Sequence, residues 1–295
     1  MLDFRTIELS DSERIKKLLS LSDYRGCEYC FANNFAWHRL ADTKIAFYKD
    51  FYISCSFKYG IHFTYPAGKG DIADIIGQMR EYAESNNSPL IISSVCEEEK
   101  RQLASVFGSD SFTVEQNRDS YDYIYNVSDL VNLSGRKYHS KRNHLSKFRS
   151  SFNYTFDAIT ENDFDDCIKL AALSYNEKSG YDSDSAVAEQ YAINAFFNHY
   201  NELSLVGGIL RVDGAIAAFS IGERINSDTI GVHIEKADTS FEGSFTAVNN
   251  EFLKMYGGNF TYVNREEDMG IDGLRKAKQS YYPAFMQIKN TITFK

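Results

Sequence analysis

The chain has 295 residues, of which 43% are hydrophobic and 15% aromatic, so it can bury substantial cores and global disorder is excluded. Its formal net charge of −9 argues against a general binder of double-stranded DNA, which needs a broadly basic surface. Five cysteines, an odd number in a long chain, favour a reducing compartment over a disulfide framework. The sequence shows no secretory signal and no apolar run long enough for a transmembrane segment, so we expect a cytoplasmic protein.

The first 130 residues predict a single α/β layer. Apolar residues recur with the helical period in four segments, at residues 10–23, 31–40, 72–85 and 97–107. Runs rich in β-branched and aromatic residues predict strands at residues 45–57, 59–65, 89–95 and 112–127. A sheet covered by helices follows from this order, and we assign residues 1–130 to a first domain.

Residues 134–151 form the most biased segment of the chain. They include six Lys or Arg residues and no Asp or Glu. Tyr138, Leu145 and Phe148 lie at helical spacing on one face, which leaves the cations on the other faces. We therefore predict a basic helix at residues 136–149 that docks through its aromatic stripe. Its cations either bind the phosphates of a ligand or belong to a solvated linker helix.

The second half repeats the pattern of the first, and we assign residues 131–295 to a second domain. Helices are predicted at residues 163–175, 183–200 and 245–256. Strands are predicted at residues 203–212, 215–224, 229–237, 260–264 and 285–294. The resulting order is helix, helix, three antiparallel strands, helix, strand, helix, strand.

The stretch from residue 260 to residue 285 concentrates charge after a predicted strand. Five consecutive polar residues follow that strand, namely Asn264, Arg265, Glu266, Glu267 and Asp268. Asp272 can cap a short helix that ends before Pro283 and carries Arg275, Lys276 and Lys278. A strand end beside the N-terminus of a helix is where α/β proteins often bind anions. The alternative is an edge loop of solvated charges.

Two shorter patterns offer further candidates. His233 and Glu235 lie two residues apart on a predicted strand, so we expect them on one face, where either can take a proton from an attacking amine or hydroxyl. The alternative is a polar pair on the sheet surface. Cys27 and Cys30 form a lone Cys-x-x-Cys without the second pair that structural zinc requires, so we expect buried cysteines and no metal site.

The element order of the second half resembles the N-acetyltransferase (GNAT) fold, and the first half resembles a degenerate second copy. Three motifs carry a narrower resemblance: GRKYHSKRNHLSKF at residues 135–148, HIEKADTSFEG at 233–243 and YVNREEDMGIDGLRKAKQSYYP at 262–283. Together they resemble the DUF2156 family, which is related to the C-terminal domain of bacterial phosphatidylglycerol lysyltransferases and more distantly to the Fem peptidyl transferases.

The resemblance implies an α/β (α+β) fold of two tandem GNAT-like domains, each a mixed, mostly antiparallel sheet flanked by helices. It also implies an acyltransferase or aminoacyltransferase that moves an activated acyl group to an amine or hydroxyl of a small-molecule or peptide acceptor. The donor, aminoacyl-tRNA or acyl-CoA, would enter between splayed central strands, and no tightly bound cofactor is expected. The pyrophosphate motif of acetyltransferases is absent, and residues 238–244 stand in its place.

Within this hypothesis each candidate residue has a role. The donor phosphate would be bound by Arg136, Lys137, His139, Lys141 and Arg142. His233 or Glu235 would act as the base. The acceptor would be shaped by Asn264, Arg265, Glu266, Glu267 and Asp268, with further charge from Arg275 and Lys278. A second hypothesis is a non-catalytic GNAT-like module that binds RNA or an anionic metabolite. In both cases we expect the two basic helices and the strand of His233 to line one cavity.

Overall fold

Two structural units divide the chain, and each combines separate stretches of sequence. The first unit consists of Met1–Asp122, Glu267–Gly270 and Met286–Lys295, and the second of Tyr123–Glu266 and Ile271–Phe285. This computed structural model describes residues 2–176 and 183–295. The division differs from the contiguous domains predicted at residues 1–130 and 131–295, because the last strand of the chain pairs inside the first unit.

The sheet of the first unit is mixed and mostly antiparallel. Its strands lie in the order β1 (Thr43–Tyr48), β2 (Phe51–Ser56), β3 (His62–Thr64), β5 (Ile91–Val95), β14 (Asn290–Phe294) and β6 (Phe112–Gln116), while β4 (Ala67–Gly68) pairs with β2. β3 and β5 run parallel, and β14 is antiparallel to both of its neighbours.

The sheet of the second unit has the same character. Its strands lie in the order β13 (Phe285–Gln287), β7 (Asp122–Asn126), β12 (Tyr262–Asn264), β11 (Thr229–Ala237), β10 (Ala215–Arg224), β9 (Val206–Val212) and β8 (Tyr154–Ala158). β11 and β12 run parallel, whereas β8, β9, β10 and β11 form an antiparallel series. The predicted α/β (α+β) class, two mixed and mostly antiparallel sheets flanked by helices, is confirmed.

Helices cover the sheet of the first unit. They are α1 (Ser12–Ser22), α2 (Phe31–Trp37), α3 (Ile72–Ser85) and α4 (Glu97–Phe107). α3 buries Ile75, Ile76 and Met79. Met79 follows the two isoleucines by four and three residues, so the three side chains form one stripe on the face of the helix that meets the core. The side chain of Asp71 caps this helix by accepting hydrogen bonds from two backbone N–H groups, a contribution of about 1 kcal/mol.

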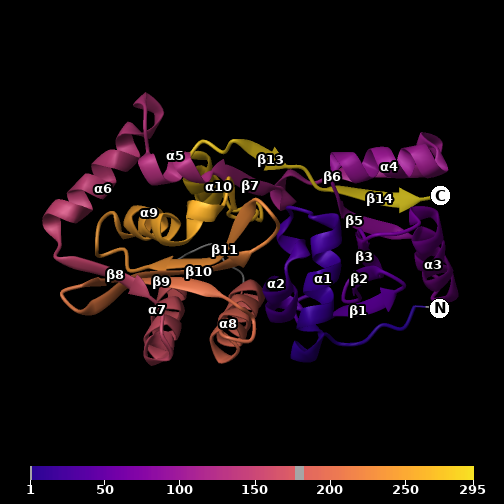
Figure 1. Ribbon diagram of the computed structural model, residues 1–295, viewed down its shortest axis with the longest axis horizontal. Helices are drawn as coiled ribbons and strands as arrows, with labels where there is room; N and C mark the ends of the chain where they lie inside the picture. Colours follow the sequence, from indigo (N-terminus) through magenta and orange to yellow (C-terminus); the bar gives the residue numbers. More distant parts are fainter. Residues whose placement is uncertain (1, 177–182) are drawn as a thin grey trace. The chain divides into compact units, whose positions relative to one another are not determined.

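In the second unit, helices lie on both faces of the sheet. They are α5 (Val127–Asn132), α6 (His139–Ser151), α7 (Phe164–Asn176), α8 (Ser183–Asn198), α9 (Ser244–Tyr256) and α10 (Asp272–Gln279). α9 covers one face of β9–β11, and α7 and α8 cover the opposite face (Figure 1). Phe197 and Phe219 pack together on the α8 side, and Phe252 of α9 is buried on the other. Each face of this sheet therefore has its own apolar layer.

Several predicted elements are subdivided in the structure. The strand predicted at residues 45–57 is a hairpin of β1 and β2, which turns at Lys49 with a φ of +50°. The strand predicted at residues 112–127 divides into β6 and β7, which belong to different sheets. The helix predicted from Asp272 has Ile271 at its N-cap position, and no side chain caps it. α5 and β8 were not predicted.

Candidate active site in the second unit

The parallel pairing of β11 and β12 is short, and the two strands separate beyond it. Pairing extends from Thr229–Tyr262 to Gly231–Asn264, after which β11 continues to Ala237 while the other chain turns away. The Asn264 side-chain oxygen accepts a hydrogen bond from the Glu266 N–H at 2.7 Å, and Glu266 adopts a φ of +58°. A positive φ in a non-glycine residue is costly, so tertiary contacts hold this turn. Splayed central strands, as expected, are present.

A β-bulge in β11 sets the direction of His233. Ile221 pairs with Ile234 and Gly222 with Val232, which leaves His233 as the extra residue. Its ring stacks on Phe196 of α8, with centroids 5.6 Å apart. Glu235 instead accepts a hydrogen bond from Asn249 of α9, on the opposite face of the sheet (Figure 1). The prediction that His233 and Glu235 share one face is therefore wrong, because the bulge interrupts the alternation of side chains.

His233 is enclosed on the α8 side. Its Nδ1 lies 2.8 Å from Oε1 of Glu266 and its Nε2 lies 3.2 Å from Oε1 of Glu223, while its side chain has no exposed surface. A buried imidazole with both nitrogens engaged cannot also contact a substrate in this arrangement. We therefore assign His233 to positioning, since it holds the Glu266 turn against β10.

On the opposite face, Glu235 and Arg265 form an ion pair. Nη2 of Arg265 lies 2.8 Å from Oε1 of Glu235, and Nδ2 of Asn249 donates to Oε2 at 3.1 Å. The side chain of Arg265 is 11% exposed and that of Glu235 is 12% exposed. Burial disfavours the charged guanidinium, but Glu235 together with Tyr125 and Tyr281 outweighs that effect, so the pKa of Arg265 lies above its ordinary value. The guanidinium of Arg265 is therefore held in its charged form.

Backbone contacts fix Arg265 in place. Its N–H donates to the Tyr123 carbonyl at 3.0 Å, and its carbonyl accepts from Nζ of Lys278 at 2.5 Å. Lys278 is itself buried, with 9% of its surface exposed. Lys278 thus holds the backbone of Arg265 through this hydrogen bond, whereas the sequence predicted that Lys278 contributes charge at the acceptor site. Arg275 lies on the same helix, where its N–H donates to the Ile271 carbonyl.

Lys141 brings a second cation to this ion pair. Its Nζ lies 3.8 Å from the centroid of the Tyr281 ring, and Cζ of Arg265 lies 5.0 Å from the same centroid. Burial, together with the charge of Arg265, lowers the pKa of Lys141 to about 8. The Tyr138 hydroxyl donates to the Tyr281 carbonyl at 3.0 Å and ties the start of the basic helix to this place. Lys141 of the basic helix and Arg265 of the charged turn therefore meet at Tyr281. His233 faces away from them, so the prediction that its strand lines one cavity with the two basic helices is wrong.

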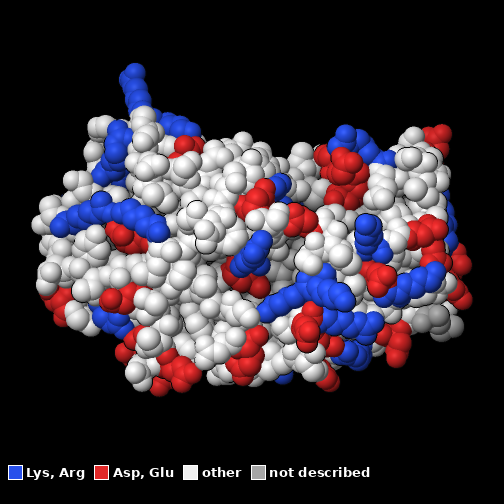
Figure 2. All heavy atoms as spheres, in the orientation of Figure 1, with Lys and Arg blue, Asp and Glu red and all other residues white. Residues whose placement is uncertain are grey.

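The remaining cations of the basic helix are largely engaged within the protein. Arg142 donates to the carbonyls of Leu133 and Gly135, and three ion pairs join Lys137 to Asp129, Lys147 to Glu242 and Arg149 to Glu251. Lys and Arg atoms gather over α6 in Figure 2. Arg136 and His139 are exposed at the start of the helix and take part in none of these ion pairs.

The predicted charged turn is shared between the two units. Asn264, Arg265 and Glu266 belong to the second unit, whereas Glu267 and Asp268 belong to the first. Asp268 is fully buried, accepts from the Gly270 N–H at 3.0 Å and lies 3.4 Å from Nη1 of Arg118. Asp268 is therefore a structural residue of the first unit, and its predicted role in shaping an acceptor is not supported.

A buried lysine organises a second charged cluster, in the first unit. Nζ of Lys289 lies 2.7 Å from Asp122, 2.6 Å from Glu28 and 3.4 Å from Sγ of Cys27. Cys27, Asp122 and Glu267 place potential metal ligands within 4.8 Å of one another. Burial and the charge of Asp122 raise the pKa of the Cys27 thiol well above its usual range, which opposes thiolate ligation. Lys289 already supplies the compensating positive charge.

The loop before α9 occupies the position that the resemblance associates with pyrophosphate binding. Gly243 precedes the helix with a φ of +93°, and a Cβ atom there would lie 2.8 Å from the His144 carbonyl oxygen of α6. Lys147 of α6 also pairs with Glu242 at 2.5 Å. α6 therefore packs directly against this helix N-terminus, and a carboxylate stands beside it. Both features disfavour pyrophosphate at this position.

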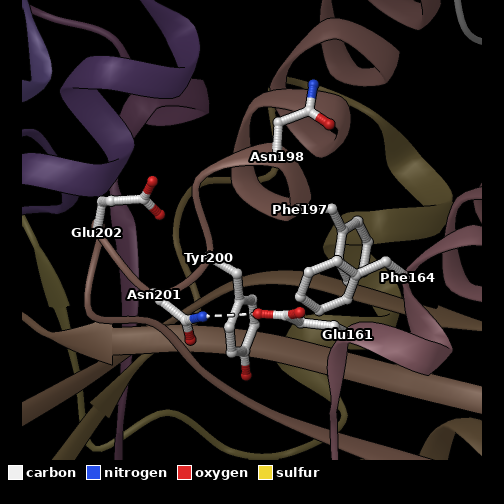
Figure 3. A pocket seen from close by; sticks show the side chains of 7 residues that line it. All are labelled: Glu161, Phe164, Phe197, Asn198, Tyr200, Asn201 and Glu202. Carbon is white, nitrogen blue, oxygen red and sulfur yellow. Dashed lines mark hydrogen bonds between the residues drawn. The ribbon is translucent and has the colours of Figure 1, made fainter.

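A separate hollow of about 450 Å³ lies at the end of α8 (Figure 3). Phe164, Phe197 and Tyr200 form its apolar side, and Asn201 donates to Glu161 across it at 3.1 Å. None of the predicted site residues lines it. We therefore place the candidate site at the ion pair and not at this hollow.

Four residues that shape the candidate site were not predicted. They are Phe196, Glu223, Asn249 and Tyr281. Tyr281 could have been selected as a candidate from the sequence, since it lies in the third motif, two residues before Pro283. The other three stand on helices or strands distant in sequence, and no local pattern marks them.

Comparisons with known proteins agree with this architecture. A family model described as phosphatidylglycerol lysyltransferase, C-terminal, matches residues 19–289. A crystal structure of a conserved protein of unknown function from Bacteroides thetaiotaomicron is 34% identical, with a TM-score of 0.93 over 100% of both chains. The structure of L-PGS from Bacillus licheniformis is 14% identical and shares the fold, with a TM-score of 0.67 over 96% of this chain and 92% of that one.

A further relative is uncharacterized. It is a protein of Mycoplasmoides gallisepticum, 24% identical over 173 residues, which cover 57% of this chain and 54% of the relative. The chain thus matches about half the length of that relative. Within residues 2–176 and 183–295, no helix has the length and apolar character needed to cross a bilayer. The family match extends over most of the chain, and the chain belongs to the family of phosphatidylglycerol lysyltransferase C-terminal domains.

Proposed function

We propose that this chain is an aminoacyltransferase or acyltransferase whose reaction centre lies where β11 and β12 separate. The observation that carries the proposal is the convergence of Glu235, Arg265 and Lys141 at that point. These residues come from β11, the turn after β12 and α6, so three distant segments contribute to one charged centre. The family description, which names lysyl transfer, supports the same class of reaction.

Acyl transfer to an amine or hydroxyl needs a proton acceptor and positive charge near the acyl carbonyl. Glu235 is the proposed acceptor, because its carboxylate lies beside Arg265 where the strands separate and keeps 12% of its side-chain surface exposed. Arg265 and Lys141 supply the positive charge. His233, which was an alternative base, acts through Glu266 and the turn, because its imidazole is enclosed.

We propose aminoacyl-tRNA as the donor in preference to acyl-CoA. The N-terminus of α9, where CoA pyrophosphate would be expected, is covered by α6 and lies beside Glu242. Arg136 and His139 remain exposed at the start of α6 and can contact the phosphates of an RNA acceptor stem. The donor brings its own activated ester, so this reaction requires no resident cofactor.

A transfer assay tests the proposal. Purified protein is mixed with tRNA charged with labelled lysine and with phosphatidylglycerol vesicles, and in parallel with labelled acetyl-CoA. We expect labelled product from the tRNA, and about 100-fold slower turnover for Glu235→Gln. Donor binding, followed as ligand-linked thermal stabilisation, should change by less than about threefold.

Glu98→Gln is the matched control, because Glu98 also pairs with an arginine, Arg101, but on the exposed surface of α4. It should retain full activity. Stabilisation by charged tRNA without any transfer would instead support the non-catalytic RNA-binding module. Transfer from acetyl-CoA alone would contradict the proposed donor.

A further inference from the structure

Only one of the two terminal nitrogens of the Arg265 guanidinium forms a hydrogen bond. Its Nη2 donates to Glu235 at 2.8 Å, whereas its Nη1 is buried and has no hydrogen-bond partner. A buried donor without a partner is unfavourable, and native proteins keep few of them. The exceptions often mark places where a ligand completes the hydrogen bonding. Nη1 of Arg265 can therefore donate a hydrogen bond to an acceptor on a ligand.

Lys141 makes the same place electropositive. Its Nζ lies against the Tyr281 ring that Arg265 also approaches, and within the described ranges no carboxylate stands within ion-pair distance of it. Glu235 is thus paired with Arg265 alone, and the positive charge of Lys141 is left without an ion pair among the described residues. The low pKa of Lys141 has the same cause, since burial and Arg265 both disfavour its protonation. An anion placed beside both cations would relieve this repulsion.

The donors are also preorganised. Arg265 is anchored through its backbone by Tyr123 and Lys278, and its partner Glu235 is anchored by Asn249. A donor whose backbone and ion-pair partner are both fixed loses less entropy when a ligand binds.

We propose that Nη1 of Arg265 and Nζ of Lys141 together bind one anionic oxygen group of the substrate. This inference rests on the proposed transferase and deepens it, because it assigns a substrate group to two named donors. The group has two possible sources. One is a phosphate of the donor, bound in the ground state. The other is the acyl carbonyl oxygen, which becomes negative when the attacking nucleophile adds to the carbonyl carbon and loses that charge when the ribose oxygen leaves.

Binding of inorganic phosphate and pyrophosphate, measured by isothermal titration calorimetry, tests the first source. The variants are Lys141→Gln and Arg265→Lys, and the control is Lys147→Gln, which lies on the same helix but belongs to an ion pair with Glu242. We expect at least tenfold weaker binding in both variants and less than twofold change in the control. Circular dichroism verifies folding. The double variant Arg265→Gln/Glu235→Gln, which leaves no carboxylate unpaired, replaces Arg265→Lys if that variant fails to fold.

Turnover of the same variants tests the second source. If wild-type protein binds no phosphate, a fall of at least tenfold in kcat with little change in KM for Lys141→Gln and Arg265→Lys assigns the group to the acyl oxygen. Phosphate binding that depends on both residues supports the inference even if no transfer activity is found, so the two proposals can fail separately. Unchanged binding and unchanged kcat in both variants, or equal losses in Lys147→Gln, would overturn it.

Discussion

The two units share a topology but differ in what occupies the end of their parallel strand pair. β3 and β5 of the first unit correspond to β11 and β12 of the second, and β14 and β7 fill equivalent places in the two sheets. At β5 of the first unit, the Tyr29 hydroxyl lies 3.3 Å from the carbonyl oxygens of Tyr65 and Ser94, and the Tyr65 hydroxyl donates to Gln102. Beyond β12, Arg265 retains an unpartnered donor.

The charges of the two units differ in the same way. In the first unit, Lys289 is a single buried cation among Asp122 and Glu28, which satisfy it. In the second, Glu235 pairs with Arg265, and the neighbouring Lys141 forms no ion pair with a described carboxylate. Removing one member of a compensated buried cluster destabilises the fold, whereas a buried cation without a paired carboxylate can be compensated by a negatively charged ligand. We infer that the first unit is a scaffold and that the second carries the chemistry.

The largest expected effect comes from Lys289→Met, which removes the buried cation of the first unit. Asp122 and Glu28 would then be buried without compensation, so we expect a loss of about 3–5 kcal/mol in the free energy of unfolding. Trp37, the single tryptophan of the chain, lies on α2 and reports unfolding of this unit by fluorescence in urea. Lys44→Met, at an exposed pair with Asp42, should change stability by about 0.5 kcal/mol or less. Equal effects of the two variants would contradict the scaffold role.

A smaller loss is expected from Gly243→Ala, in the second unit. The φ of +93° disfavours alanine, and the new methyl group would press on the His144 carbonyl of α6. We expect a loss of roughly 2 kcal/mol in thermal unfolding. Gly258→Ala is the matched control, since nothing lies within 4 Å of a Cβ atom built there. If Gly243→Ala proves neutral, α6 does not cover the N-terminus of α9, and CoA becomes an acceptable donor.

The smallest effect concerns the pH dependence contributed by Lys141. Its pKa of about 8 in the folded protein lies below the ordinary 10.5, so the folded state binds fewer protons than the unfolded chain between these values. The stability of wild-type protein should therefore rise across that interval relative to Lys141→Met, by on the order of 1 kcal/mol once solvent screening is allowed for. The groups that face Lys141 are Arg265, Glu235 and Tyr281. Parallel stability curves for the two proteins would contradict the electropositive cluster.

Local patterns in the sequence predict much of this fold. α3, α4, β10 and β11 have the predicted bounds, because each combines a clear apolar period with an evident turn or cap. Sheet membership was not predictable in the same way, since β7 and β14 look like ordinary strands and their partners are far away in sequence. The contiguous domain boundaries therefore did not include the pairing of β14, from the end of the chain, with strands of the first unit.

The candidate site shows the same limit. The charged turn and the basic helix were evident from composition, and both supply residues to the cluster at Tyr281. The direction of His233 was not, because one extra residue in β11 reverses the face on which it lies. The cluster of Lys289 was also missed, since Glu28 and Asp122 are distant in sequence and unremarkable in composition.

The central claim is that chemistry belongs to the Glu235 face of β11 and not to the His233 face. It is tested most directly by comparing kcat/KM for Glu235→Gln and His233→Gln in transfer from lysyl-tRNA. We predict a loss of about 100-fold or more for Glu235→Gln and less than about tenfold for His233→Gln, with the latter lost mainly through stability. The reverse order, with His233→Gln the more damaging in folded protein, would contradict the account.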